Sequence, residues 1–238
     1  MRILVTGGAG YIGSHMTRML AARGDIPIVV DTLEYGHKSA LPPEAIFIKG
    51  SVGDASLLKR VFSEQKISAV IHFAGYISVE ESVRDPRRYF HNNLINPITL
   101  LEVMVQFGVK KIIFSSTAAV YGNPRQVPIP EEHPKDPLNP YGLSKWCFEK
   151  LLGVYDRQKQ IRSMSLRYFN ASGAALDGAY GEFHEPETHI IPLAISTALG
   201  QQKEFSLFGK DYPTRDGSCI RDYIHVEDLC QSHLLALE

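Results

Sequence analysis

The sequence predicts an α/β fold in which a parallel sheet carries helices on both faces. Two observations predict it: short apolar runs alternate with helical stretches up to about residue 170, and a glycine-rich turn joins the first run to the first helix. Such alternation produces right-handed β–α–β crossovers and therefore parallel strands. After residue 170 the pattern changes to loops with few regular elements. We therefore predict a sheet domain over residues 1–170 and a smaller, incomplete α/β lobe over residues 171–238.

Composition excludes several classes of function. The chain has 238 residues, of which 44% are apolar and 21% charged, as in ordinary globular proteins, and its net charge is -1. Nothing suggests nucleic acid or a membrane as a partner, because neither a basic balance nor an apolar run of spanning length is present. The three cysteines, Cys147, Cys219 and Cys230, are far apart and odd in number, which favours free thiols in a reducing cytoplasm. The nine histidines show no metal-ligand spacing, so we predict no metal site.

The first strand, residues 2–6, runs directly into glycines at positions 7, 8, 10 and 13, and helical periodicity follows to about residue 23. Bare backbone lets a pyrophosphate approach the helix N-terminus, where free N–H groups and the helix dipole favour anions. The spacing is G-x-x-G-x-x-G, which differs from the G-x-G-x-x-G of many dehydrogenases. We interpret the turn as a dinucleotide phosphate cradle.

A second strand, residues 28–30, ends at Asp31, at the distance from the glycines where an acidic residue meets the adenosine ribose hydroxyls. A carboxylate there would repel a 2′-phosphate, so NAD is favoured over NADP. A third strand at residues 47–48 leads to Gly50 and Ser51, and residues 55–65 are helical.

A fourth strand, residues 69–73, enters a turn of small residues that would let the cofactor come close. One long helix is expected over residues 87–107, carrying Asn92 and Asn93. A fifth strand, residues 111–115, ends in Ser115, Ser116 and Thr117. Hydroxyls at the carboxyl end of a central strand lie where open α/β sheets bind ligands, although they also end strands for local hydrogen-bonding reasons.

Tyr141 and Lys145 lie four residues apart on one face of a predicted helix that Asn139 caps and Pro140 begins. A phenol loses its proton near pH 10 and is a poor base at neutral pH. A nearby ammonium stabilises the phenolate and lowers its pKa, so the pair can form a general base.

The remainder of the chain is less regular. A sixth strand is expected at residues 162–168, a short helix at 189–199, a short strand at 205–208 and a loop at 209–217. The final helix, residues 226–238, is expected to pack back on the first domain. It contains no stop signal, so the chain is expected to be a fragment of a longer protein.

Several motifs occur in an order that resembles the extended short-chain dehydrogenase/reductase family. They are Thr6–Gly13 (TGGAGYIG), His72–Gly75 (HFAG), Ser115–Thr117 (SST), Tyr141 with Lys145, and Arg167–Asn170 (RYFN). The later stretches 207–214 and 221–226, with Gly217 between them, are similar to the UDP-glucose 4-epimerases within that family. The resemblance spans the whole chain and implies a Rossmann-type NAD-binding sheet.

The resemblance also implies an activity, the interconversion of UDP-glucose and UDP-galactose in galactose metabolism. Tyr141 would take the proton from the sugar 4-hydroxyl, Thr117 would hydrogen-bond the same hydroxyl, and Lys145 would hold the nicotinamide ribose. Hydride would move from C4 to NAD, which gives a 4-keto sugar. This sugar would rotate in the pocket, and the hydride would return to its other face.

The same resemblance implies two sets of binding residues. The implied NAD-binding residues are Gly7, Gly10, Tyr11, Ile12, Gly13, Asp31, Ser51, Val52, Phe73, Ala74, Gly75, Asn92, Ser115, Tyr141, Lys145 and Tyr168. The implied substrate-binding residues are Thr117, Tyr141, Asn170, His189, Ile190, Phe208 and Arg221. In the family pattern, the Asn170 amide and the Arg221 guanidinium bind the phosphates, and the Phe208 ring lies near the uracil.

Departures from the family pattern leave alternatives open. Ser51 stands where the family usually has Asp, which predicts weaker NAD binding. A nucleotide-sugar 4,6-dehydratase would carry an Asp–Glu pair where this chain has Ala118 and Ala119, which argues against dehydration. A 4-epimerase acting on UDP-glucuronate or UDP-N-acetylglucosamine, and a non-catalytic NAD-binding relative, remain possible interpretations. The helices at 87–107 and 140–159 resemble those that form a dimer interface in the family, so a homodimer is expected.

Overall fold

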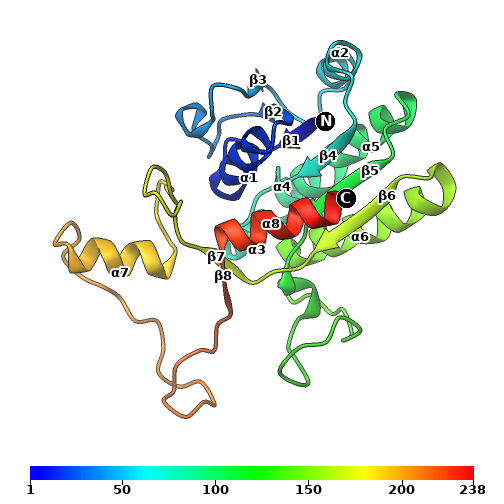
Figure 1. Cartoon of the computed structure of the whole chain (residues 1–238). Coiled ribbons are helices and arrows are strands. Elements are labelled where there is room, and N and C mark those ends of the chain that lie inside the picture. The colour runs from blue at the N-terminus through cyan, green and yellow to red at the C-terminus, as the bar shows by residue number, and fades with distance from the viewer.

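The computed structural model describes residues 1–238 and contains a six-stranded parallel sheet (Figure 1). The strand order is β3-β2-β1-β4-β5-β6, so the direction of winding reverses between β1 and β4. Every neighbouring pair is parallel. The strands are β1 (Arg2–Thr6), β2 (Ile26–Asp31), β3 (Ile46–Lys49), β4 (Ala69–His72), β5 (Lys111–Ser115) and β6 (Arg162–Leu166). The predicted parallel sheet is confirmed.

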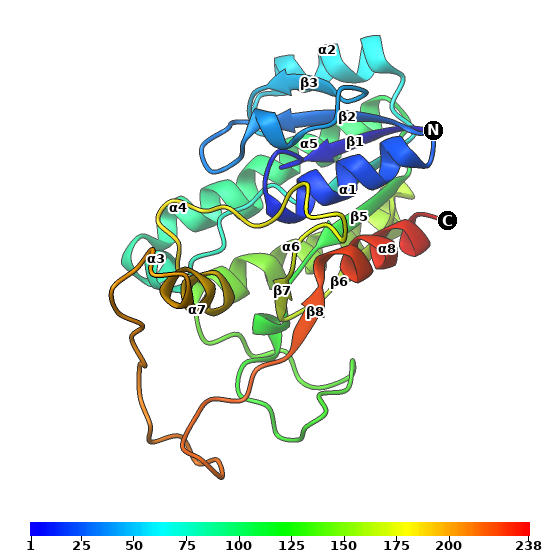
Figure 2. The same cartoon turned by 60° about the vertical axis from the view of Figure 1, so that its left-hand side comes forward.

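Helices cover both faces of this sheet because side chains alternate along each strand (Figure 2). In β1, Ile3 and Val5 pack with α1 and α8, whereas Leu4 packs with α2, α5 and α6. The α-helices that surround the sheet are α1 (Tyr11–Ala22), α2 (Ala55–Gln65), α3 (Val79–Arg84), α4 (Pro86–Phe90), α5 (Asn96–Gln106), α6 (Pro140–Lys159) and α8 (Val226–Leu237). Short 3-10 turns are η1 (Lys38–Ala40) and η3 (Ala118–Tyr121). None of the helices is long and apolar enough to cross a membrane.

The single helix expected over residues 87–107 is wrong in detail. The structure has α4, then a π-helical turn η2 (His91–Ile95), then α5. Pro97 explains the interruption: it has no N–H to donate, and its ring would clash with the carbonyl of Asn93 in an α-helical arrangement. Widening the turn relieves this clash. It also places Asn92 and Asn93 in the π-turn.

Residues after β6 are arranged differently from the expectation. The strand β7 (Asn170–Ser172) pairs with β8 (Tyr223–His225) in a separate two-stranded parallel sheet that the sequence did not predict. Between them the chain forms loops and one helix, α7 (Ile190–Ala198), which stands away from the main sheet in Figure 1. The strand expected at residues 205–208 is wrong, because this apolar run is exposed and pairs with no other strand.

The last helix, α8, lies against the main sheet. Its apolar residues Val226, Cys230 and Leu234 join Ile3 and Val5 in one buried cluster. The Cys230 thiol also approaches the carbonyl of Ile12, at 3.7 Å, next to the glycine turn. The chain thus leaves the main sheet after β6 and packs back on it through α8.

Candidate active site

A large cavity of about 2080 Å³ opens at the carboxyl ends of the strands. Parallel strands all end at one edge of the sheet, and this cavity lies where the order reverses between β1 and β4. It is lined by the glycine turn after β1, the segments after β4 and β5, and the start of α6. Residues from the loop before α7 and from β8 complete the wall.

The glycine turn is closely packed and leaves bare backbone facing the cavity. Gly7 has φ +70°, a left-handed conformation that side chains disfavour, and a Cβ on Gly13 would overlap the Gly7 carbonyl oxygen. A Cβ on Gly10 would meet only that same oxygen, at 3.4 Å, so the surface of Gly10 is open. Since α1 begins at Tyr11, its free N–H groups lie at the cavity. These features fit the pyrophosphate of a dinucleotide.

Asp31 ends β2 at the cavity, and its carboxylate is held in place by backbone donors. Its Oδ2 accepts from the N–H of Ala9, at 3.0 Å, and its Oδ1 accepts from the N–H of Leu33, at 2.8 Å. Each oxygen keeps a second lone pair for a ribose hydroxyl. Ser51 lies on the same side, where its Oγ accepts from the N–H of Gly53, at 3.1 Å.

Asn93 is a positioning residue that sequence reasoning did not place in the site. It is buried, its Oδ1 accepts from the N–H of Tyr76, at 2.8 Å, and its Nδ2 donates to the Tyr76 carbonyl and to Ser144 Oγ. It therefore ties the segment after β4 to α6. Asn92 lines the cavity and donates to Asn93 Oδ1 at 3.2 Å. The available signal was Pro97, which interrupts the α-helix and so places Asn93 in the π-turn.

The start of α6 brings Tyr141 and Lys145 to the cavity. Asn139 caps the helix by accepting the N–H of Gly142, at 2.8 Å, and Pro140 occupies the first turn, as predicted. Lys145 is 3% exposed, and its ammonium donates to the Ser115 carbonyl at 3.0 Å. The ammonium also lies 5.0 Å from the centre of the Phe114 ring. Lys145 is thereby fixed against β5.

The pKa directions differ from the sequence-based expectation. Burial raises the pKa of Tyr141, and a side-chain hydrogen bond with Thr117 lowers it less strongly. Burial also lowers the pKa of Lys145 to about 8. The expectation that Lys145 lowers the pKa of Tyr141 is therefore wrong for the protein by itself, since removal of both groups from water is the dominant effect. An ionised phenolate at Tyr141 requires further positive charge.

Twenty of the residues singled out from sequence line this one cavity. They are Gly7, Gly10, Tyr11, Ile12, Gly13, Asp31, Ser51, Val52, Phe73, Ala74, Gly75, Asn92, Ser115, Thr117, Tyr141, Lys145, Tyr168, Asn170, His189 and Arg221. Tyr168 and Ser115 hydrogen-bond each other through their hydroxyls. The side-chain amide of Asn170 donates to the Asp222 carbonyl, at 2.7 Å, across the β7–β8 pair.

Phe208 and Ile190 are not brought to the cavity. Phe208 is 87% exposed and Ile190 is 51% exposed, and neither contributes to the cavity wall. Phe208 lies in the exposed run at 205–208, which forms no helix or strand. Ile190 is the first residue of α7, a helix without a buried residue. Their expected substrate contacts stay predictions, because neither side chain lies at the cavity wall.

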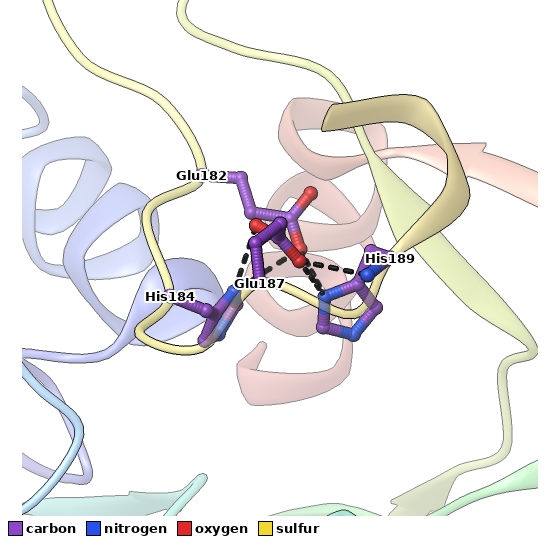
Figure 3. Close-up of side chains that lie close together, drawn as sticks. All are labelled: Glu182, His184, Glu187 and His189. Atoms are coloured by element: carbon purple, nitrogen blue, oxygen red, sulfur yellow. Dashed lines mark hydrogen bonds and ion pairs between the residues drawn. The ribbon is translucent and has the colours of Figure 1, made fainter. Parts of the chain in front are cut away.

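Sequence reasoning also missed a group of histidine and glutamate side chains beside the cavity. Glu182, His184, Glu187 and His189 converge in the loop before α7, and we refer to them as the His–Glu cluster (Figure 3). The available signal was the local pattern E-x-H-x-x-E-x-H within eight residues. Glutamates supply half of this pattern, so the spacing of histidines and cysteines alone does not reveal it.

Comparisons with known proteins agree with these features. The model of the NAD dependent epimerase/dehydratase family matches residues 3–238. A UDP-glucose 4-epimerase from Lacticaseibacillus casei is 50% identical over 238 residues, which is all of this chain and 72% of that protein.

Two solved structures show the same arrangement. A UDP-glucose 4-epimerase from Brucella ovis in complex with NAD has a TM-score of 0.95 at 44% identity, over 99% of this chain and 72% of that one. A UDP-glucose 4-epimerase from Bifidobacterium longum in complex with NAD+ and UDP has a TM-score of 0.93 at 42% identity, over 98% of this chain and 73% of that one.

Proposed function

The chain belongs to the NAD dependent epimerase/dehydratase family, and on that premise we propose how its residues interconvert UDP-glucose and UDP-galactose. It is an epimerase that inverts C4 of the sugar and uses NAD as a bound cofactor. The observation that carries the residue assignment is the convergence of Thr117, Tyr141 and Lys145 with the glycine turn in one cavity.

Several groups of this chain suit the parts of the dinucleotide. The bare backbone at Gly10 and the N-terminus of α1 accept the pyrophosphate. Asp31 accepts ribose hydroxyls, and Ser51 offers a hydroxyl to the adenine, where it binds less strongly than a carboxylate would. Lys145, fixed against the Ser115 carbonyl, donates to the nicotinamide ribose.

Tyr141 acts as the proton acceptor for the sugar 4-hydroxyl, and Thr117 hydrogen-bonds to the same hydroxyl. NAD, when bound, would supply the acceptor for the hydride from C4 and a positive charge. Tyr141 would return its proton to the C4 oxygen when the 4-keto sugar is reduced on its other face, so that C4 is inverted without net oxidation. Asn170 and Arg221 lie on the cavity wall and would hold the nucleotide phosphates.

Dehydration is the alternative reaction within the family, and the residues beside Thr117 oppose it. Ala118 and Ala119 line the cavity at the position where acid–base side chains would be needed to move protons at C5 and C6. Methyl groups cannot transfer protons. The positions beside Thr117 therefore offer no side chain for elimination.

The test is conversion of UDP-galactose to UDP-glucose by the chain with NAD, followed by proton NMR. Tyr141→Phe should lower turnover by roughly 10²–10⁴-fold, the usual contribution of a positioned proton acceptor, while NAD binding is retained. Tyr155→Phe is the matched control, because Tyr155 is on the same helix and its hydroxyl donates instead to Glu102. Equal loss in both variants, or full turnover by Tyr141→Phe, would contradict the assignment.

We also propose a homodimer formed through α6 and the helical segment of α4, η2 and α5. Apolar side chains remain exposed there, among them Ile95, Leu143 and Val154. Analytical ultracentrifugation should give twice the chain mass, and Ile95→Asp should give the monomer. Leu235→Asp, also at an exposed position but on α8, should leave the dimer intact.

The three free cysteines support a cytoplasmic location. Residues 171–238 are proposed as the nucleotide-sugar part of the protein.

A further inference from the structure

The His–Glu cluster brings four potential metal ligands together within one loop. Glu182, His184, Glu187 and His189 lie between β7 and α7, and their ligand atoms are all within 4.8 Å of one another. Figure 3 shows the two imidazole rings and the two carboxylates directed toward a common centre. Nothing in the proposed epimerase chemistry uses these four groups as a set.

The distances within the cluster are close to those of a tetrahedral metal site. Zinc binds imidazole nitrogen and carboxylate oxygen at about 2.0–2.2 Å, so neighbouring ligands of a tetrahedron lie about 3.3–3.6 Å apart. His184 Nδ1 is 3.3 Å from Glu182 Oε1 and 3.8 Å from Glu187 Oε2. His189 Nδ1 is 3.0 Å from Glu182 Oε1 and 2.9 Å from Glu187 Oε1. These four distances lie within a few tenths of an ångström of a tetrahedral edge, and the cluster as a whole, within 4.8 Å, would have to contract around the ion.

Burial and charge favour a cation at this centre. The Glu182 side chain is only 7% exposed, and neither lysine nor arginine pairs with it. His184 Nδ1 is sealed from solvent and faces the two carboxylates at 3.3 and 3.8 Å, without a hydrogen bond of good geometry. The ion-pair partners of the Glu182 carboxylate are the two imidazoles, and one metal ion would satisfy these groups together. Two imidazoles with two carboxylates form a donor set suited to Zn²⁺ and its neighbours.

We propose that the His–Glu cluster binds one divalent transition-metal ion of the Zn²⁺ class as a structural site. The ligands are the carboxylates of Glu182 and Glu187 and the Nδ1 atoms of His184 and His189. All four protein ligands together close the coordination sphere, as in structural rather than catalytic zinc sites. The ion therefore takes no part in proton or hydride transfer.

The consequence of such a site is a fixed wall on one side of the cavity. Glu182, His184 and His189 line that cavity, and the His184 ring lies 6.4 Å, edge-on, from the ring of Tyr11 at the start of α1. The Tyr11 hydroxyl also donates to the Gly173 carbonyl at the start of the same loop, at 2.7 Å. Coordination through Nδ1 leaves His189 Nε2 free to bind in the cavity. The metal would fasten the loop beside the glycine turn.

The test is titration of the chelator-treated full chain with Co²⁺ and with Zn²⁺ in the absence of nucleotide. We expect one Co²⁺ per chain, with the strong visible absorption of a four-coordinate site, and displacement of Co²⁺ by one equivalent of Zn²⁺. His184→Ala and His189→Ala should each weaken Zn²⁺ binding by more than the roughly 10–100-fold that loss of an outer-shell partner costs. His91→Ala, at an exposed histidine outside the cluster, should bind as the parent does.

Glu187→Gln guards against a folding artefact, because it keeps the size of the side chain and removes only the charge. It should weaken Zn²⁺ binding while NAD binding and the circular dichroism spectrum remain those of the parent chain. The proposal is overturned if the parent binds no Co²⁺ beyond surface background. It is also overturned if the parent, His184→Ala and His91→Ala bind Zn²⁺ alike. Metal binding is measured without substrate, so failure here leaves the epimerase assignment standing.

Discussion

The sheet region and the segment between β7 and β8 use their apolar residues in opposite ways. In the sheet region two large clusters of buried side chains fill both faces of the sheet. From residue 173 to 222 the only buried residue is Ala175, and Phe205, Leu207 and Phe208 are exposed. Both regions contribute to the same cavity wall. The site therefore joins a part of the chain held by packing to a part held by polar contacts and turns.

This difference separates stability from recognition within one site. Burial of apolar area is the main stabilising contribution to folding, so the sheet region should carry almost all of the free energy of unfolding. Groups such as Asn170 and Arg221 contribute little to that free energy and remain available to a ligand. Matched substitutions inside and outside the sheet region should therefore separate effects on the free energy of unfolding from effects on ligand binding.

The largest difference is expected between two phenylalanines. Phe148 is fully buried between α6 and the sheet, where its ring lies 4.8 Å from that of Phe114, whereas Phe208 is exposed. Phe148→Ala should lower the free energy of unfolding by about 3–5 kcal/mol, and Phe208→Ala should change it by less than about 0.5 kcal/mol. Urea denaturation of both variants measures this. Similar losses at the two positions would show that residues 205–208 are packed in solution.

The same contrast explains what could be predicted from sequence. Apolar runs and helical patterns predicted all six strands of the main sheet and α1, α2 and α6, because those patterns report burial within the sheet and against it. The pattern at 205–208 looked like a strand, but an apolar run becomes a strand only where a sheet edge is available. The β7–β8 pair was missed because three-residue strands are too short for periodicity to detect.

Site residues followed the same rule. Residues at strand ends and at the start of α6 were predictable, because the topology of a parallel sheet brings strand ends together. Phe208 and Ile190 were inferred from resemblance alone, and no local packing holds them at the cavity. The π-turn could be predicted only from the clash that Pro97 would make with the carbonyl of Asn93, one turn earlier in the helix. The His–Glu cluster depended on loop conformation, which hydrophobic patterning does not encode.

A second comparison sets Gly13 in the glycine turn against Gly200 after α7. A Cβ on Gly13 would overlap backbone atoms of Gly7 and lie 2.8 Å from the Cα of Gly8, whereas nothing lies within 4 Å at Gly200. Gly13→Ala should lower the free energy of unfolding by about 1–3 kcal/mol and weaken NAD binding. Gly200→Ala should lower the free energy of unfolding by about 1–2 kcal/mol at most, because of its positive φ of 72°. It should bind NAD as the parent does. Calorimetric NAD titration separates the two, and unchanged affinity in Gly13→Ala would argue against the cradle.

Burial in the sheet region should also be visible as pH dependence. Burial lowers the pKa of His72 to about 3, and its Nδ1 lies 2.6 Å from Thr6 Oγ1. Between pH 3 and about 6.5 the unfolded chain therefore binds one proton more than the folded chain. The free energy of unfolding should fall by about 1.4 kcal/mol for each pH unit below 6.5 from this residue alone.

The variant His72→Gln removes this titration and should flatten the acid side of the stability profile. Exposed His91→Gln is the control and should retain the slope of the parent. Urea denaturation at several pH values between 4.5 and 7 gives the three profiles. Parallel profiles for the parent chain and His72→Gln would mean that His72 is protonated in the folded state or reaches water.

The smallest effect concerns how the two helices at the cavity begin. Asn139 caps α6 through its side chain, whereas α7 begins after His189 without a side-chain cap. Asn139→Ala leaves the N–H of Gly142 without its partner and should cost about 1 kcal/mol, while Asn139→Asp should cost almost nothing. Because Tyr141 lies in the first turn, the loss should appear as faster hydrogen exchange there and slower turnover, with NAD binding little changed. If Asn139→Ala and Asn139→Asp exchange alike at Gly142, packing of α6 on the sheet, and not its cap, fixes the position of the catalytic tyrosine.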